Sequence, residues 1–229
     1  MDIVYVLKND IEPYELRYSL RSLKNFPHDK VWFFGGEPAF LKPDRIVYVK
    51  QKGGTPWARV SYTLRKVCEN PEVSEDFYLF NDDFFIMKPL ENYQPRYNGS
   101  LYQHAREIEE RHNGKISGYT AHLRETARAL EEKGYSTLNY AMHVPMLINK
   151  KKALEVLDEF PNIPMFRSLY GNKFSIGGVN THDVKIMLID KEPSHNAEMI
   201  STADNSFLVG KVGAYIKSQF PERCEYETD

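Results

Sequence analysis

The chain has 229 residues, of which 41% are hydrophobic and 27% are charged, and its formal net charge is −2. This length and composition are typical of one large globular domain, or one domain with an elaborated insert, that buries a real core. The charge argues against a strongly basic nucleic-acid-binding protein, although clustered arginines and lysines could still form a local basic groove.

The first 90 residues alternate between strand-like and helix-like patterns. Apolar runs predict strands, and apolar residues at helical spacing predict amphipathic helices. In chain order we expect a strand at 3–8, a helix at 14–26, strands at 31–34 and 45–50, a helix at 58–69 and a strand over 77–87. This alternation predicts an α/β fold with a mainly parallel central sheet and flanking helices.

The middle of the chain is more polar and predicts a helical insert. Charged, amphipathic helices are expected at 105–111 and 122–133, and they are followed by a strand at 142–148, a helix at 150–160 and a last helix at 208–220. No internal repeat or low-complexity linker divides the sequence. We therefore expect a single domain over residues 1–229.

The most informative segment is Asn81-Asp82-Asp83, which interrupts the apolar run from 77 to 87. A buried strand tolerates adjacent carboxylates only when something compensates them, because an unpaired buried charge costs several kcal/mol. One interpretation is a turn that joins two short strands, since Asn and Asp favour turns. The other is a ligand site just past a strand's carboxyl end, where Asp82 and Asp83 bind Mg²⁺ or Mn²⁺ and the ion in turn binds nucleotide phosphates.

Other polar residues have both structural and functional interpretations. His143 lies in an apolar segment and is either a core histidine or a general base. Arg167, which we expect in a loop, is either a surface residue or a diphosphate-binding fork. His182-Asp183 is either a pair of metal ligands or the cap of a helix or turn, and we prefer the cap. Asp204-Asn205 is interpreted as the start of a helix. Walker-type and G-x-G-x-x-G phosphate loops are absent from the sequence, and no serine or cysteine nucleophile lies in a known motif.

Cysteine usage and the N-terminus favour the cytoplasm. Cys68 and Cys224 are far apart, with no metal-binding spacing and no disulfide framework. The N-terminus begins directly as a strand, without the features of a signal peptide, and no apolar run approaches the length of a membrane helix. We expect a cytoplasmic protein without a membrane span.

Several segments, in order, resemble the Stealth proteins, which are sugar-phosphate transferases of capsule synthesis. The resemblance is carried by Asp2-Ile3-Val4-Tyr5, by residues 15–22, by residues 80–85, by His143-Val144-Pro145, by residues 160–161 and 166–168, and by the end of the chain at 220–221 and 226–227. It implies a fold similar to GT-A glycosyltransferases, in which an aspartate motif binds a divalent ion at the donor diphosphate. Compact members of this kind also look like phage-encoded glycosyltransferases, some of which modify DNA bases.

The resemblance implies roles for individual residues. It places Asp82 and Asp83 at the metal, and Asp83, His143 and Arg167 at the catalytic centre. It also implies that the donor is bound by Arg17, Arg21, Asn81, Asp82 and Asn205. On this interpretation residues 1–90 form the nucleotide-sugar-binding half, 91–140 the helical insert, and 141–229 the acceptor and catalytic half.

The expected function is metal-dependent transfer of a sugar from a nucleotide sugar to a hydroxyl of a glycan or a modified DNA base. A hexose-1-phosphate transferase of polysaccharide synthesis is the first alternative. A non-catalytic module that binds sugar or nucleic acid is the second. The expected cofactor is Mn²⁺ or Mg²⁺. For a phage protein, the expected location is the host cytoplasm. The sequence leaves open the identity of the sugar, the nucleotide and the acceptor, and the oligomeric state.

Overall fold

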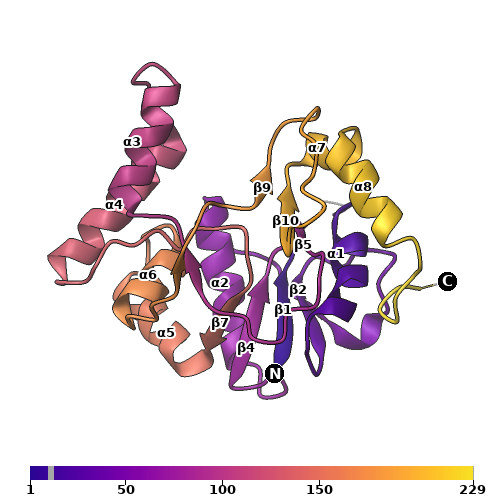
Figure 1. Ribbon diagram of the computed structural model, residues 1–229. Helices are drawn as coiled ribbons and strands as arrows, with labels where there is room; N and C mark the ends of the chain where they lie inside the picture. The colour runs from indigo at the N-terminus through magenta and orange to yellow at the C-terminus, as the bar shows by residue number, and fades with distance from the viewer. Residues whose placement is uncertain (10–12, 229) are drawn as a thin grey trace.

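The structure of the protein is a computed structural model that describes residues 1–9 and 13–228 (Figure 1). A five-stranded sheet lies at its centre, in the order β3-β2-β1-β4-β7. Its strands are β1 (Asp2–Val6), β2 (Val31–Gly35), β3 (Ile46–Tyr48), β4 (Asp76–Phe80) and β7 (Met146–Asn149). The first four are parallel, and β7 runs antiparallel to β4. The predicted α/β fold with a mainly parallel sheet is confirmed.

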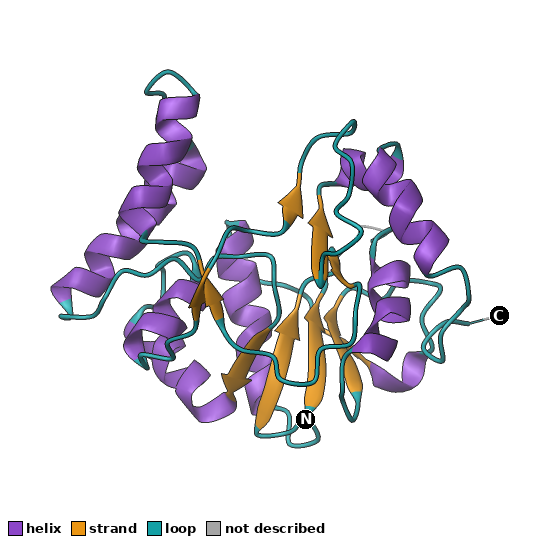
Figure 2. Ribbon diagram, viewed as in Figure 1, coloured by secondary structure: helices purple, strands orange, loops and turns teal. Residues whose placement is uncertain are grey.

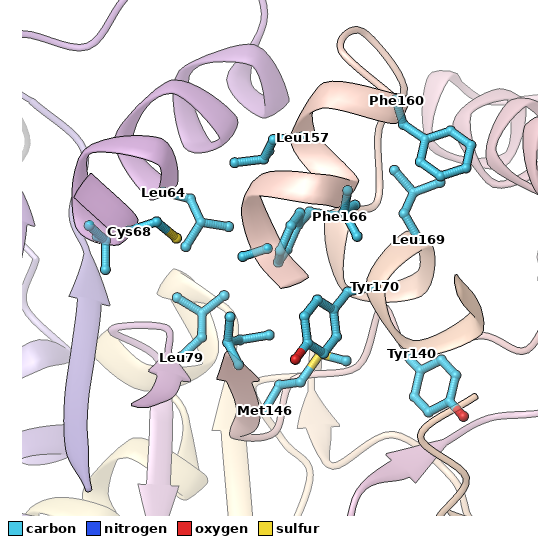
Figure 3. Close-up of a cluster of buried hydrophobic side chains, with 14 of the residues drawn as sticks. Leu64, Cys68, Leu79, Tyr140, Met146, Leu157, Phe160, Phe166, Leu169 and Tyr170 are labelled. Atoms are coloured by element: carbon cyan, nitrogen blue, oxygen red, sulfur yellow. The ribbon is translucent and has the colours of Figure 1, made fainter. Parts of the chain in front are cut away.

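Helices cover both faces of this sheet because side chains along each strand alternate between the faces. Ile3 and Tyr5 pack with α1 (Leu16–Ser22) and the following 3₁₀ turn η1 (Leu23–Asn25). Val4 faces the other way, toward α2 (Pro56–Glu69) and α5 (Lys150–Glu159). Figure 3 shows part of that second core, where side chains of α2 and α5 meet strand residues and helix α6 (Phe166–Lys173).

The helical insert projects from the body of the molecule (Figures 1 and 2). It consists of α3 (Leu101–Arg111) and α4 (Gly118–Glu132), which pack side by side. Both helices are capped by serines: Ser100 accepts a hydrogen bond from the Gln103 backbone, and Ser117 forms a capping box with Thr120. At the base of the insert, β6 (Arg96–Tyr97) pairs in parallel with β8 (Val179–Asn180).

A second, smaller sheet extends the molecule beyond the carboxyl ends of the central strands. It has the order β5-β10-β9 and consists of β5 (Phe84–Ile86), β10 (Met199–Thr202) and β9 (Lys185–Ile186). Helices α7 (Asp204–Leu208) and α8 (Lys211–Gln219) pack on it through a separate apolar cluster that includes Phe85 and Phe207. A further 3₁₀ turn, η2 (Pro43–Arg45), precedes β3.

Three elements differ from the sequence expectation. The run 77–87 is two strands rather than one, because β4 belongs to the central sheet whereas β5 pairs with β10. The strand expected at 142–148 begins only at Met146, because Pro145, which has no backbone N–H to donate to a sheet, immediately precedes it. Arg167 lies in the first turn of α6 instead of a loop. Within the described residues, no helix has the length and apolar character needed to cross a bilayer.

Candidate active site

A cleft of about 1000 Å³ lies at the carboxyl ends of β1 and β4. The lining side chains that matter for chemistry come from three parts of the chain. Lys8 and Glu15 follow β1, the turn Asn81-Asp82-Asp83 follows β4, and the later segments contribute His143, Arg167, Lys185 and Asp204. Trp57 at the start of α2 and Tyr119 at the start of α4 lie on the lining of the same cleft. This is the position at which open α/β sheets bind their ligands.

The interpretation of Asn81-Asp82-Asp83 as a turn is confirmed, and the binding of a metal ion there stays a prediction. The three residues form a turn between two short strands, and the same turn lies just past the carboxyl end of β4, on the lining of the cleft. The chain must leave the central sheet here because Phe84 enters the second sheet opposite Ser201. The two carboxylates therefore stand where the two sheets meet.

Asp83 is the most constrained acid of the site and is only 8% exposed. Its Oδ2 accepts hydrogen bonds from Lys185 Nζ at 2.9 Å and from Ser201 Oγ at 3.0 Å. Its Oδ1 is buried and has no hydrogen-bond partner among the described residues. Buried polar atoms are nearly always satisfied in folded proteins, so this oxygen indicates a position that a ligand completes.

Asp82 and Glu15 share the acidic side of the cleft. Burial, followed by the charge of Asp83, raises the pKa of Asp82 to about 6. Burial also raises the pKa of Glu15 to about 7, and the charges of Asp83 and Asp82 raise it by smaller amounts. A hydrogen bond from the Thr202 hydroxyl acts in the opposite direction and lowers this pKa. Burial is the main cause of both shifts, and carboxylates with raised pKa values gather at functional sites.

His143 and Asp183 form a hydrogen-bonded pair. Asp183 Oδ2 lies 2.7 Å from His143 Nδ1, and Asp183 Oδ1 accepts the His143 backbone N–H at 3.1 Å. Burial by itself would raise the pKa of Asp183. The hydrogen bonds and charge of His143 together have a larger, opposite effect, so the pKa of Asp183 lies below its ordinary value. The carboxylate fixes the ring with Nδ1 protonated, which leaves Nε2 as the acceptor.

His143 reaches the cleft because β7 runs antiparallel to β4. Met146 at the start of β7 pairs with Leu79 near the end of β4, so the residues before β7 lie beside the Asn81 turn. Asp183 comes just before β9, which pairs with β10. The preferred interpretation of Asp183 as a cap was wrong, because its carboxylate binds His143 across 40 residues of sequence.

Arg167 lines the cleft, but its guanidinium is largely committed to the protein. Its Nη1 donates to the Val144 carbonyl at 2.7 Å, and its Nη2 donates to the Leu79 carbonyl at 3.1 Å and to Asn81 Oδ1 at 3.2 Å. Burial lowers the pKa of Arg167 to about 10. Arg167 thus joins the end of β4 to the segment before β7 and orients the first residue of the acidic turn.

Three residues expected at the donor lie elsewhere. Arg21 forms two hydrogen bonds with the Glu227 carboxylate, at 2.7 and 2.9 Å, and Arg17 forms another at 3.1 Å. The Glu227 side chain is fully buried, so both arginines compensate its charge and attach the C-terminal segment to α1. Asn205 is exposed, and it is the preceding Asp204 that lines the cleft.

The sequence analysis missed Glu15 and Lys185 as site residues. Glu15 falls within the segment 15–22 of the resemblance, which gave it no role, and Lys185 belongs to a two-residue strand. Lys185 reaches the acidic turn through the pairing of β9 with β10, and Glu15 lies at the cleft beside Thr202 of β10, with which it forms a hydrogen bond.

A divalent ion at Asp82 and Asp83 fits the residues present, because the buried Asp83 Oδ1 has no partner among the residues that the structure describes. Among residues 1–9 and 13–228, however, no three histidine, cysteine or acidic side chains are grouped as a complete set of metal ligands. Mg²⁺ and Mn²⁺ commonly bind one or two carboxylates and complete their coordination with water and phosphate oxygens. The two aspartates are sufficient for that mode of binding.

No family model matches the chain, and no curated protein matches it. It is similar to three solved structures that we compare here. An active-site mutant of LgtC has 12% identity and a TM-score of 0.48, with 98% of each chain covered. The galactosyltransferase LgtC with donor and acceptor sugar analogues has 13% identity and a TM-score of 0.43, covering 82% of this chain and 76% of that one. Mouse xyloside xylosyltransferase 1 in its apo form has 8% identity and a TM-score of 0.41, covering 90% and 99%. At these scores the likeness carries no argument about activity.

Proposed function

We propose that the protein is a glycosyltransferase of GT-A-like fold that transfers a sugar from a nucleotide-sugar donor to an acceptor hydroxyl. The observation that carries the proposal is the buried oxygen of Asp83, which has no hydrogen-bond partner within residues 1–9 and 13–228, in a large cleft at the carboxyl ends of parallel strands. The resemblance of the Asn81-Asp82-Asp83, His143 and Arg167 segments to sugar-phosphate transferases supports the same class of chemistry.

Asp82 and Asp83 would bind a divalent ion, which when present supplies positive charge to the donor diphosphate. The raised pKa values of Asp82 and Glu15 support this assignment, because a bound cation favours their ionised forms. Arg167 contributes by positioning: it orients Asn81 and the end of β4 and places its buried charge beside the acidic turn.

His143 is the proposed general base. Its Nδ1 is held by Asp183, so Nε2 is available to accept the proton of the acceptor hydroxyl. As that proton moves to Nε2, the acceptor oxygen forms a bond to the anomeric carbon of the sugar. The bond between this carbon and the phosphate oxygen breaks, and its electron pair leaves with the nucleoside diphosphate. Asp183 stabilises the imidazolium that results.

The decisive experiment is turnover of a panel of nucleotide sugars with Mn²⁺, by the wild type and by Asp83→Asn. The proposal expects loss of turnover by a factor of about 100 or more, comparable to the removal of one transition-state-stabilising group in other enzymes. Unchanged turnover in Asp83→Asn would exclude the metal assignment. Ligand binding without any nucleotide release would favour the non-catalytic module instead.

Mass spectrometry of the products separates the two transfer reactions. Sugar transfer releases a nucleoside diphosphate, whereas transfer of a sugar phosphate releases a nucleoside monophosphate. We favour sugar transfer, to a glycan or to a modified DNA base. Detection of the monophosphate would assign the Stealth-like reaction instead.

A further inference from the structure

Lys185 forms an ion pair with Asp83 of the acidic turn and has no assigned role in the resemblance described above. Its Nζ lies 2.9 Å from Asp83 Oδ2, and its side chain, 22% exposed, lines the cleft. Residues Lys185 and Ser201 are register partners in the parallel pairing of β9 with β10. Both therefore reach the same oxygen of Asp83 from neighbouring strands, and the second sheet fixes the position of the ammonium group.

We infer that Lys185 binds the diphosphate of the donor directly and does so without a divalent ion, an inference that rests on the proposed function. An ammonium group has three hydrogen-bond donors, and the described contacts of Lys185 use one of them, toward Asp83. The remaining donors belong to a side chain that lines the cleft. A phosphate oxygen beside Asp83 is thus within reach of Lys185 in the geometry that the protein already has.

The charges of the cleft explain why a fixed cation is needed at this point. Glu15, Asp82, Asp83 and Asp204 all line the same cavity. They would repel a diphosphate that approaches the turn. Arg167 is less suited to receive it, since its guanidinium already donates to two carbonyls and to Asn81. Lys185 lowers this repulsion before any metal arrives and offers its free donors to the phosphate.

A purely structural ion pair would have a different geometry. A buried ion pair that only neutralises an acid offsets its desolvation cost when hydrogen bonds satisfy all the remaining polar atoms of both partners. Here Asp83 keeps an Oδ1 without a partner in the described part of the chain, and Lys185 remains partly open to the cleft. Both groups thus retain binding capacity on the side that faces the ligand.

The test is calorimetric binding of inorganic pyrophosphate to the full chain in EDTA. We expect Lys185→Met to weaken binding by about tenfold or more, because charged hydrogen bonds to phosphate are among the strongest in proteins. Lys185→Arg should retain most of the affinity. The matched control is Lys191→Met, since Lys191 is also a lysine of this segment but is exposed and does not line the cleft.

A second pair of variants separates direct binding from a disturbance of Asp83. Removing Lys185 alone leaves Asp83 without its cation, which could weaken pyrophosphate binding by repulsion. Asp83→Asn should bind pyrophosphate in EDTA at least as tightly as the wild type, whereas the double variant Asp83→Asn with Lys185→Met should lose that affinity. Equal affinities of Asp83→Asn and the double variant would overturn the inference, as would wild-type binding that strictly requires Mn²⁺.

The inference and the proposed function fail in different ways. Pyrophosphate binding that depends on Lys185, together with no turnover of any nucleotide sugar, would reject the transferase but leave the diphosphate site in place. Turnover that is unaffected by Lys185→Met, with pyrophosphate affinity also unchanged, would reject the role of Lys185 and leave the transferase.

Discussion

The buried carboxylate of Glu227 gives the sharpest prediction about Arg17 and Arg21. The side chain of Glu227 is fully buried and accepts hydrogen bonds from both arginines and from the Cys224 backbone N–H. Glu227→Ala leaves these donors and two positive charges without their partner. Breaking a buried pair in this way costs about 3–5 kcal/mol, and we expect the lower end because Arg17 is 39% exposed.

For a chain of this size, about 3 kcal/mol corresponds to a fall in melting temperature of about 6–12 °C. Differential scanning calorimetry and urea denaturation would measure it. The matched control is Glu222→Ala, because Glu222 lies in the same terminal segment but is exposed, and its loss should change stability by less than about 0.5 kcal/mol.

A variant of Arg21 tests whether these arginines bind the donor. Our reasoning expects Arg21→Ala to lower stability while pyrophosphate affinity in the folded protein stays the same. A Glu227→Ala protein that melts within about 2 °C of the wild type would refute the structural account. So would an Arg21→Ala protein of normal stability that no longer binds pyrophosphate.

Three further predictions follow from the titratable and buried groups. The pKa of Glu15 is raised to about 7 in the fold, so the wild type loses folding stability as pH rises from about 4.5 to 7 and Glu15 ionises. Glu15→Gln cannot ionise, and it should be about 2 kcal/mol more stable than the wild type at pH 8 but equally stable at pH 4. Urea denaturation at both pH values would measure the difference. His143→Gln should lower kcat by about 10²–10⁴-fold, and Asp183→Asn by about 10–100-fold with KM little changed, in steady-state kinetics. Arg167→Lys should lose stability by about 2 kcal/mol, because an ammonium group cannot span the acceptors on Val144, Leu79 and Asn81, and calorimetry would measure this.

Each of these has a clear contrary result. If the stability difference between Glu15→Gln and the wild type is the same at pH 4 and at pH 8, Glu15 ionises in the folded protein at little cost. Activity of Asp183→Asn equal to that of the wild type would mean that His143 needs no orienting partner. An Arg167→Lys protein with unchanged melting and lost activity would move Arg167 from positioning to direct ligand binding.

The order of strands and helices was accessible from the sequence because each buried strand and each amphipathic helix has a local pattern. The central strands and α2 were placed within a few residues, since an apolar run or an apolar stripe needs no knowledge of its neighbours. The run 77–87 was the exception. Its apolar residues look alike, and only the pairing of β5 with β10 shows that they belong to different sheets.

Local sequence also sufficed to identify the acidic turn, because two carboxylates inside an apolar run conflict with burial and so require a partner. The local sequence could not show which residue is that partner. Lys185 and Ser201 come from segments with no motif, and they meet Asp83 only because β9, β10 and β5 pair in one sheet. The resemblance named Arg17 and Arg21, whereas the fold commits both to Glu227.

The sequence by itself determined the α/β class and the position of the Asn81-Asp82-Asp83 turn at the end of a strand, since these depend on periodicity and on the cost of burying charge. Only the tertiary structure decided which charges compensate one another: Lys185 with Asp83, Asp183 with His143, and Arg21 with Glu227. The physical reason is that electrostatic partners are selected by distance in space, and the tertiary fold brings together residues that are 40 to 206 positions apart in the chain.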